Sequence, residues 1–451
     1  MACAVVAGVV LLAATRSLVF VGDDWDVILA SPHSSLLSWL TAHNGHWSTM
    51  EVLVFEALFR IDGIRSYAPF MATLLVLHAG SALLLFTYVR HRAGDAIGLA
   101  CMISLLFFGN GGDGFLWAQQ ITFTGSVCFG LLALVLLDHE APGAGRLISA
   151  SAALVVALMF SNIGVFFCLY GIVATVRVSR WRYRLPAYAA PLAMFAIWFM
   201  AFGRNSPGLA VPSSLPQENP GAIVAFVVTG ISSTSLGLLG AYHAWATGWW
   251  AALIFVSLLV AMTTWWWRSS ERPAEVLGAT ASLISLFLVT AAVRAQLGAS
   301  EATASRYMYP AAIFMLIIVA MAARTMPRGS WRSSALTVVV AASVVANAAL
   351  VGLLIVHKSD DAGYAKAEMQ TLGVVRGSCG INLGIHIDQR RLGNLSARGY
   401  FRAVDQLGSP VPAIRTDQLG SLPAAPVHDV LSRLFGHKVE PKTLSDRSTG
   451  C

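Results

Sequence analysis

The sequence predicts an all-α polytopic membrane protein with about 11 transmembrane helices, followed by a small C-terminal α/β region outside the cytoplasm. Hydrophobic residues make up 56% of the 451 residues and charged residues only 12%, about half the charged share of soluble globular proteins. The apolar residues also gather in stretches of about 15 to 23 residues, long enough to cross a bilayer as helices. Together these observations exclude a soluble enzyme.

The charged residues divide the chain into two domains. Residues 357–451 contain 12 Lys/Arg and 9 Asp/Glu, so 21 of 95 are charged, against 32 of 356 before them. We therefore expect a transmembrane domain over residues 1–356 and a soluble tail domain over residues 357–451. The net charge of +7 does not indicate a nucleic-acid partner, because loop arginines in a membrane protein mainly set its orientation.

The predicted spans follow one another along the first domain, with a polar loop from Gly22 to about Ser66 after the first of them. They are Ala2–Val21, Tyr67–Val89, Ile97–Gly111, Gln120–Leu137, Leu147–Ser161, Ile163–Val176, Pro186–Phe202, Thr247–Trp267, Val276–Val293, Tyr307–Ala322 and Ser334–Val356.

Arginines in the loops predict the orientation of these spans. Twelve fall on one side and five on the other, and the arginine-rich side is expected to be cytoplasmic. The N-terminus is then inside, the C-terminal tail is extracytoplasmic, and the protein is a multi-pass protein of the inner (plasma) membrane. Ala222 to Ala241 is also apolar enough to span, but counting it would reverse every later loop. We therefore expect it to be a buried or re-entrant element on the outer side.

The tail alternates short apolar runs, such as Gly380 to Ile387 and Val430 to Phe435, with turn residues, which favours a mixed α/β region. Cys379 and Cys451 are its two cysteines. In an oxidising compartment they could form a disulfide.

The loop after the first span carries three carboxylates within four positions, at Asp23, Asp24 and Asp26. Such a cluster repels itself, so it needs a cation, a metal ion or a functional reason to stay at the membrane surface. The alternative is an interfacial loop in which Asp23 caps a short helix.

Further polar residues in the outer loops are candidates for binding a substrate. His43, Asn44 and His46 could contact phosphate or hydroxyl groups, or simply form a hydrogen-bonded turn. Their spacing lacks the HExxH pattern of a zinc site. Arg16 lies inside the first apolar stretch, where it is either functional or extends to the surface. The remaining candidates are Trp117 and Gln120 in the second outer loop, and Arg306 with Tyr307 before a late span.

Four of these motifs together resemble bacterial multi-spanning glycosyltransferases of the C-type fold. They are Asp23-Asp24-Trp25, His43-Asn44-Gly45-His46, Trp117-Ala118-Gln119-Gln120 and Ser305-Arg306-Tyr307. The resemblance covers most of residues 1–356. It implies transfer of a sugar from a polyprenyl-phosphate-linked donor to a glycan, lipid or protein acceptor of the cell envelope, on the outer face of the membrane.

The resemblance also implies roles for particular residues. An acidic residue in the first outer loop acts as the catalytic base in these enzymes, which by position is Asp23 or Asp24. Two departures from their pattern are Trp47, where relatives often carry a basic residue, and Asp-Asp, where many have Asp-Glu.

The expected chemistry needs a carboxylate for the acceptor proton and a cation for the departing phosphate. Asp23 with Arg16 or Arg306 supplies both, and a divalent metal ion, Mg²⁺ or Mn²⁺, is a possible cofactor. The main alternative function is a transporter or flippase for a lipid-linked or polar substrate. Transporters bind near the membrane midplane and often contain repeated halves, and we find no repeat in this chain.

Overall fold

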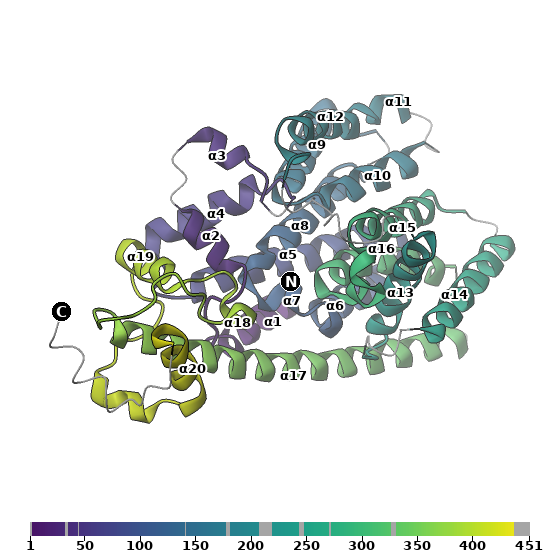
Figure 1. The fold of residues 1–451 in the computed structure, drawn as a ribbon. Coiled ribbons are helices and arrows are strands. Elements are labelled where there is room, and N and C mark those ends of the chain that lie inside the picture. The colour runs from purple at the N-terminus through teal and green to yellow at the C-terminus, as the bar shows by residue number, and fades with distance from the viewer. Residues whose placement is uncertain are drawn as a thin grey trace. The chain divides into compact units, whose positions relative to one another are not determined.

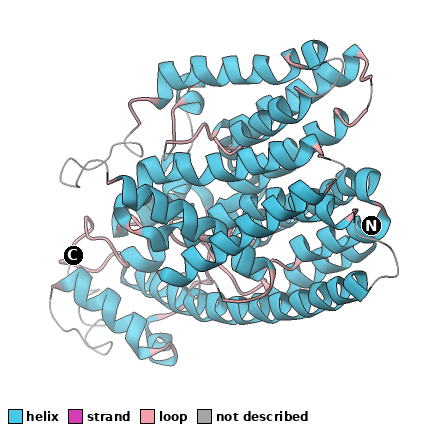
Figure 2. Ribbon diagram, turned by 90° about the vertical axis from the view of Figure 1, so that its right-hand side faces the viewer, coloured by secondary structure: helices cyan, strands magenta, loops and turns pink. Residues whose placement is uncertain are grey.

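In its described parts, the computed structural model of the protein consists of helices joined by loops, with no strand (Figures 1 and 2), which confirms the all-α membrane class. It describes residues 2–31, 35–43, 45–139, 141–176, 181–206, 219–242, 248–269, 272–325 and 331–436.

The α-helices, in chain order, are α1 Ala2–Ala14, α2 Asp24–Ala30, α3 Leu36–Leu40, α4 Thr49–Asp62, α5 Ala68–Ala93, α6 Asp95–Leu106, α7 Asp113–Leu116, α8 Ile121–Leu136, α9 Ala144–Phe160, α10 Gly164–Thr175, α11 Trp181–Arg184, α12 Pro186–Trp198, α13 Pro220–Leu238, α14 Trp249–Arg268, α15 Ala274–Arg294, α16 Ser305–Ala323, α17 Trp331–Val375, α18 Gln389–Leu392, α19 Ala397–Leu407 and α20 Ala424–Phe435. Short helical turns are η1 Gly109–Gly111, η2 Ala118–Gln120, η3 Phe199–Gly203, η6 Ala295–Leu297, η7 Ala299–Thr303 and η8 Thr416–Ser421.

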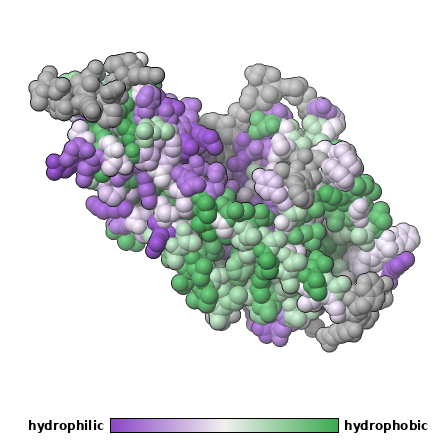
Figure 3. Space-filling model, turned by 90° about the horizontal axis from the view of Figure 1, so that it is seen from below, coloured by the Kyte–Doolittle hydropathy of each residue, from purple (hydrophilic) through white to green (hydrophobic). Residues whose placement is uncertain are grey.

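Eight helical segments in the described ranges are long and apolar enough to cross a membrane, and α1, α6, α9 and α10 are shorter apolar helices. Helix α14 is the most exposed, since only 6% of its apolar window is buried. Trp249 and Trp250 at its start and Trp267 near its end are all exposed, as in the aromatic belts of membrane proteins. Hydrophobic residues also cover a broad area of the face in Figure 3, as expected for a surface in contact with lipid.

The first predicted span, Ala2–Val21, is wrong at its end, because helix α1 stops at Ala14. The apolar residues that follow belong to a protein core instead of a lipid-facing helix. Phe20 is fully buried, and its ring packs edge-on against Tyr67 at 4.9 Å and Phe70 at 5.0 Å between ring centroids.

The chain folds into two compact units. Unit 1 comprises Met1–Val9, Trp39–Glu51 and Leu74–Leu354, and unit 2 comprises Val10–Ser38, Val52–Thr73 and Ile355–Cys451. The last segment of unit 2 starts at Ile355, next to the domain boundary that the charged residues predicted between residues 356 and 357. Unit 2 also contains two earlier segments, which hold parts of the first loop together with the end of the first predicted span and the start of the second.

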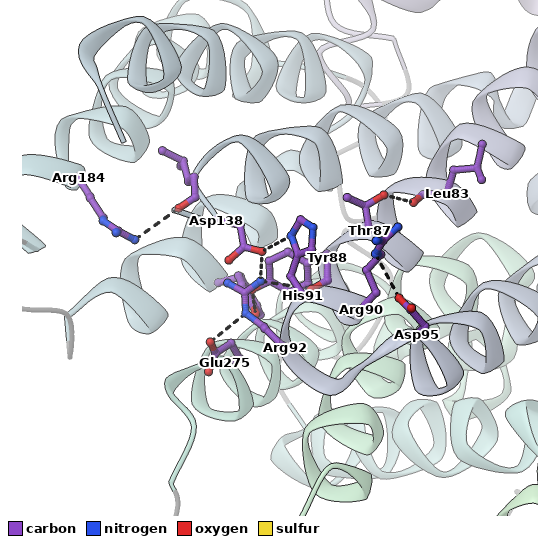
Figure 4. Close-up of polar contacts among 12 residues, drawn as sticks. Leu83, Thr87, Tyr88, Arg90, His91, Arg92, Asp95, Asp138, Arg184 and Glu275 are labelled. Atoms are coloured by element: carbon purple, nitrogen blue, oxygen red, sulfur yellow. Dashed lines mark hydrogen bonds and ion pairs between the residues drawn. The ribbon is translucent and has the colours of Figure 1, made fainter. Parts of the chain in front are cut away.

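One end of unit 1 is held by Arg92 at the end of α5 (Figure 4). Its guanidinium pairs with Asp138 after α8 at 2.5 Å and with Glu275 in the first turn of α15 at 3.0 Å. Arg184, just before α12, donates to the carbonyl of Leu137 at 3.4 Å. Loops that the arginine count places on the cytoplasmic side therefore meet at one end of this unit, whereas the side of the membrane itself stays a prediction.

Helix α13 corresponds to the segment expected to be re-entrant. At its C-terminal end, the carbonyl of Ala241 accepts from Asn110 at 3.0 Å, and the carbonyl of Asn110 accepts from Ser305 at the start of α16. This is the end opposite Arg92, since α16 ends at Ala323 and the next residue, Arg324, donates to the Arg92 carbonyl. The helix is long enough to span, so its outer-side placement stays a prediction.

The tail differs from the expected α/β region, because its described part, up to residue 436, contains helices and no strand. Val430 to Phe435 lies in helix α20. Gly380 to Ile387 is an irregular segment whose backbone bonds, such as Ile387 N to Leu395 O at 3.1 Å, form only an isolated bridge. Short apolar runs resemble strands in sequence, but here their residues, such as Ile387 and Val430, are buried without forming a strand. Cys451, the predicted disulfide partner of Cys379, lies outside the described residues.

Candidate functional site

A tight turn in unit 1 carries the two histidines of the first loop. His43 and His46 exchange backbone hydrogen bonds of 3.1 and 2.8 Å, and Gly45 between them has a φ of +80°, which a glycine adopts without strain. Asn162 donates to the Gly45 carbonyl at 2.9 Å and thereby ties the turn to the start of α10. The structure therefore contains the hydrogen-bonded turn that was one of the two interpretations of this motif. Asn44 lies outside the described residues.

His46 is a neutral side chain at physiological pH. Its Nδ1 lies 3.3 Å from the Ser161 hydroxyl, and Phe123 packs edge-on against its ring. Burial, together with the positive charges of Arg294 and Arg306, lowers the pKa of His46 to about 4. His46 can therefore donate or accept a hydrogen bond, whereas the two arginines supply positive charge at this end of unit 1.

Arg306 is oriented by its neighbours at the start of α16. Its guanidinium forms an ion pair with Glu301 and lies 5.0 Å from the centre of the Tyr307 ring. The side chain is 34% exposed, so the fork is fixed in direction yet open to solvent on one side. A guanidinium in this state can bind a phosphate through two nitrogens if it shares or exchanges the Glu301 contact.

In unit 1, the buried acid Glu51 is paired with an amide side chain, that of Gln119. Gln119 donates to Glu51 Oε1 at 2.6 Å. The side-chain oxygens of Gln119, Gln120 and Thr122 are buried and have no hydrogen-bond partner in the described part of the chain. Buried acceptors of this kind are normally satisfied by a ligand or by ordered water. Trp117 is partly exposed, and its carbonyl accepts from the backbone N–H of Gln120 at 2.9 Å.

Glu51 is almost fully buried, with 1% of its surface exposed. It was not among the site residues predicted from the sequence. A signal for it was present. Glu51, Phe55 and Phe59 follow one another at intervals of four residues in α4, so the acid lies on the same helical stripe as two buried rings.

The acids of the first loop belong to unit 2 and differ in their surroundings. Asp24 is fully buried, and its Oδ2 accepts from the Val21 amide at 3.0 Å and the Tyr67 hydroxyl at 3.3 Å. Asp23 is partly exposed and stands at the N-cap of α2 without a side-chain capping bond. The capping hypothesis for Asp23 is therefore wrong. Arg16 is exposed in the turn after α1.

The predicted site residues thus fall into two groups, one in each unit. His43, His46, Trp117, Gln120, Arg306 and Tyr307 belong to unit 1, and Arg16, Asp23 and Asp24 belong to unit 2. The ranges that the structure describes bring together no group of three His, Cys, Asp or Glu side chains suited to a metal ion. The described acids and histidines therefore do not assemble a Mg²⁺ or Mn²⁺ site.

Comparison with known proteins identifies the fold. No family model and no curated protein matches the sequence. Two solved structures of ArnT from Cupriavidus metallidurans, a glycosyltransferase of the C-type fold, are similar. The one bound to undecaprenyl phosphate aligns with a TM-score of 0.55 and 16% identity, covering 92% of this chain and 89% of that chain. The apo structure aligns with a TM-score of 0.53 and 16% identity, covering 91% and 84%. The chain therefore has the C-type glycosyltransferase fold of ArnT, which its sequence motifs had implied.

Proposed function

We propose that this protein is a membrane glycosyltransferase that moves a sugar from a polyprenyl-phosphate-linked donor to an acceptor on the outer face of the inner membrane. The observation that carries the proposal is the likeness to ArnT over about nine-tenths of both chains, which includes a structure bound to undecaprenyl phosphate. The acceptor is a hydroxyl group of a glycan, lipid or protein of the cell envelope.

The reaction forms one bond and breaks another at the anomeric carbon. The acceptor oxygen attacks this carbon, its proton passes to a carboxylate, and the bond between the sugar and the phosphate oxygen breaks. The electron pair leaves with the polyprenyl phosphate. The protein must therefore provide a base and a positive charge that stabilises the departing phosphate.

We assign the base to Asp23. Asp24 is fully buried and already accepts two hydrogen bonds, whereas Asp23 is partly exposed and can reach a water-borne acceptor.

The polar end of unit 1 supplies donor-binding groups. Arg306, whose direction is fixed by Glu301, and Arg294 provide charge for the phosphate. His46 is neutral, with a pKa of about 4, so it serves as a hydrogen-bonding group. Gln119 and Gln120 offer buried oxygens that accept from sugar hydroxyls, and Trp117, Tyr307 and His43 complete the proposed binding groups.

The test uses purified protein in detergent with a panel of undecaprenyl-phosphate-linked sugars and an envelope extract as acceptor. We expect one donor to be consumed with release of undecaprenyl phosphate and appearance of a glycosylated acceptor. Donor binding without consumption, together with movement of the lipid across proteoliposome membranes, would instead establish the flippase alternative.

A further inference from the structure

We propose that tail residues 391–402, here called the tail brace, position the acid loop, residues 22–30, from which Asp23 acts. The catalytic part of this inference rests on the proposed function. Both segments belong to unit 2, although they lie more than 360 residues apart in the sequence.

The closest contact joins two backbones immediately before Asp23. The amide of Gly22 donates to the Arg391 carbonyl at 2.7 Å. Gly393 has a φ of +57°, and a Cβ added to it would lie 2.9 Å from the Gly22 carbonyl oxygen. A side chain at residue 393 is therefore disfavoured both by its own backbone conformation and by the space that Gly22 occupies.

A second set of contacts fixes helix α2, which follows Asp23. Trp25 is fully buried, and its ring packs edge-on against Tyr400 with centroids 5.9 Å apart. Arg402 donates to the carbonyl of Leu29 at 2.9 Å. This carbonyl is one of the last of the helix, where a cation is favoured.

The tail brace is itself held firmly. Arg391 donates to Asp361 and to Asp388, each at 3.0 Å, and its guanidinium lies 3.9 Å from the centre of the Tyr364 ring. Asp388 also caps α18 by accepting from the Arg390 amide at 2.8 Å. Contacts from a fixed segment thus reach the acid loop on both sides of Asp23.

This arrangement gives the tail a role in the reaction without a contact to the substrate. A base must be held within about 0.5 Å of its productive position, and a displacement of about 1 Å can cost about 100-fold in rate. Residues of the tail brace are therefore positioning residues for Asp23.

The experiment compares Gly393→Ala with Gly363→Ala, a matched control in α17 where an added Cβ meets nothing within 4 Å. Hydrogen–deuterium exchange in detergent reports on residues 22–30. We expect Gly393→Ala to raise exchange there and to leave exchange in α9 unchanged. The kcat for the donor that the wild type consumes should fall about 10- to 100-fold, with the Kd for undecaprenyl phosphate unchanged within about twofold. Gly363→Ala should match the wild type.

Arg402→Ala is a milder second variant that removes one hydrogen bond from the end of α2, so the test does not depend on Gly393→Ala folding. Unchanged exchange in residues 22–30 in both variants overturns the proposal. Raised exchange with an unchanged kcat per folded molecule overturns the positioning role and leaves a purely structural contact. Raised exchange in a protein whose wild type transfers no sugar supports the brace and rejects the proposed function, so the two failures can be told apart.

Discussion

The adjacent acids Asp23 and Asp24 should respond differently to the same substitution. Asp24 is fully buried and its carboxylate accepts two hydrogen bonds, whereas Asp23 is partly exposed and has no capping bond. We therefore predict that Asp24→Asn lowers stability and that Asp23→Asn lowers the rate of sugar transfer.

The magnitudes follow from these contacts. A hydrogen bond to a charged group contributes about 1.5–3 kcal/mol and a neutral one about 1 kcal/mol. Both bonds are accepted by the same oxygen of Asp24, and the single oxygen of asparagine can keep both at neutral strength, so the loss should be about 2 kcal/mol for the two together. Substitution at position 23 should change stability by less than about 0.5 kcal/mol. Loss of a general base should reduce kcat by about 10²- to 10⁴-fold.

The assay measures thermal unfolding in detergent together with kcat per folded molecule for both variants. We expect Asp24→Asn to unfold several degrees lower with kcat retained, and Asp23→Asn to unfold near the wild-type temperature with kcat lost. The opposite outcome, an inactive Asp24→Asn beside an active Asp23→Asn, would refute the assignment of the base by exposure and move the base to Asp24.

Four further predictions concern other parts of the chain. Arg306→Lys should reduce transfer more than it reduces protein yield, because lysine keeps the charge but loses the planar fork; normal yield with normal turnover would make Arg306 a surface anchor. The folded pKa of His46, about 4, lies below its ordinary value of 6.5, so the unfolded chain binds a proton first and stability falls as the pH drops from about 6.5 to about 4, by roughly 3 kcal/mol. Unfolding temperatures across this range should show a smaller decline in His46→Gln, and an equal decline would contradict the burial argument. Glu51→Gln should raise the donor KM and lower the unfolding temperature by at most a few degrees, since it weakens the 2.6 Å charge-assisted bond that orients Gln119; an unaltered KM would contradict a role of Gln119 in donor binding. Finally, Cys379 should react with an impermeant maleimide in intact, reduced cells, and labelling only after permeabilisation would place the tail inside.

The sequence by itself determined the class of the protein and the grouping of its loops. Hydropathy is a property of each stretch of chain, so spans such as Val276–Val293 could be located from composition and length, and helix α15 now covers that range. The arginine pattern of the loops likewise predicted that Arg92 and Arg324 lie on the same side of the membrane, and the hydrogen bond from Arg324 to the Arg92 carbonyl agrees with that prediction. The motif resemblance predicted the fold, and the likeness to ArnT confirms it.

The tertiary structure decided which polar residues are buried and which distant segments meet. Sequence spacing could not distinguish Asp23 from Asp24, because the difference arises when Tyr67 donates to one of them. It missed Glu51, whose burial depends on packing around Gln119. The apolar residues up to Val21 looked like the end of a span, yet helix α1 stops at Ala14 and Phe20 is buried against Tyr67 and Phe70. The contact between Gly22 and Arg391 depends on the packing of segments remote in sequence. Local patterns cannot encode it, because such contacts form only when the whole chain is folded.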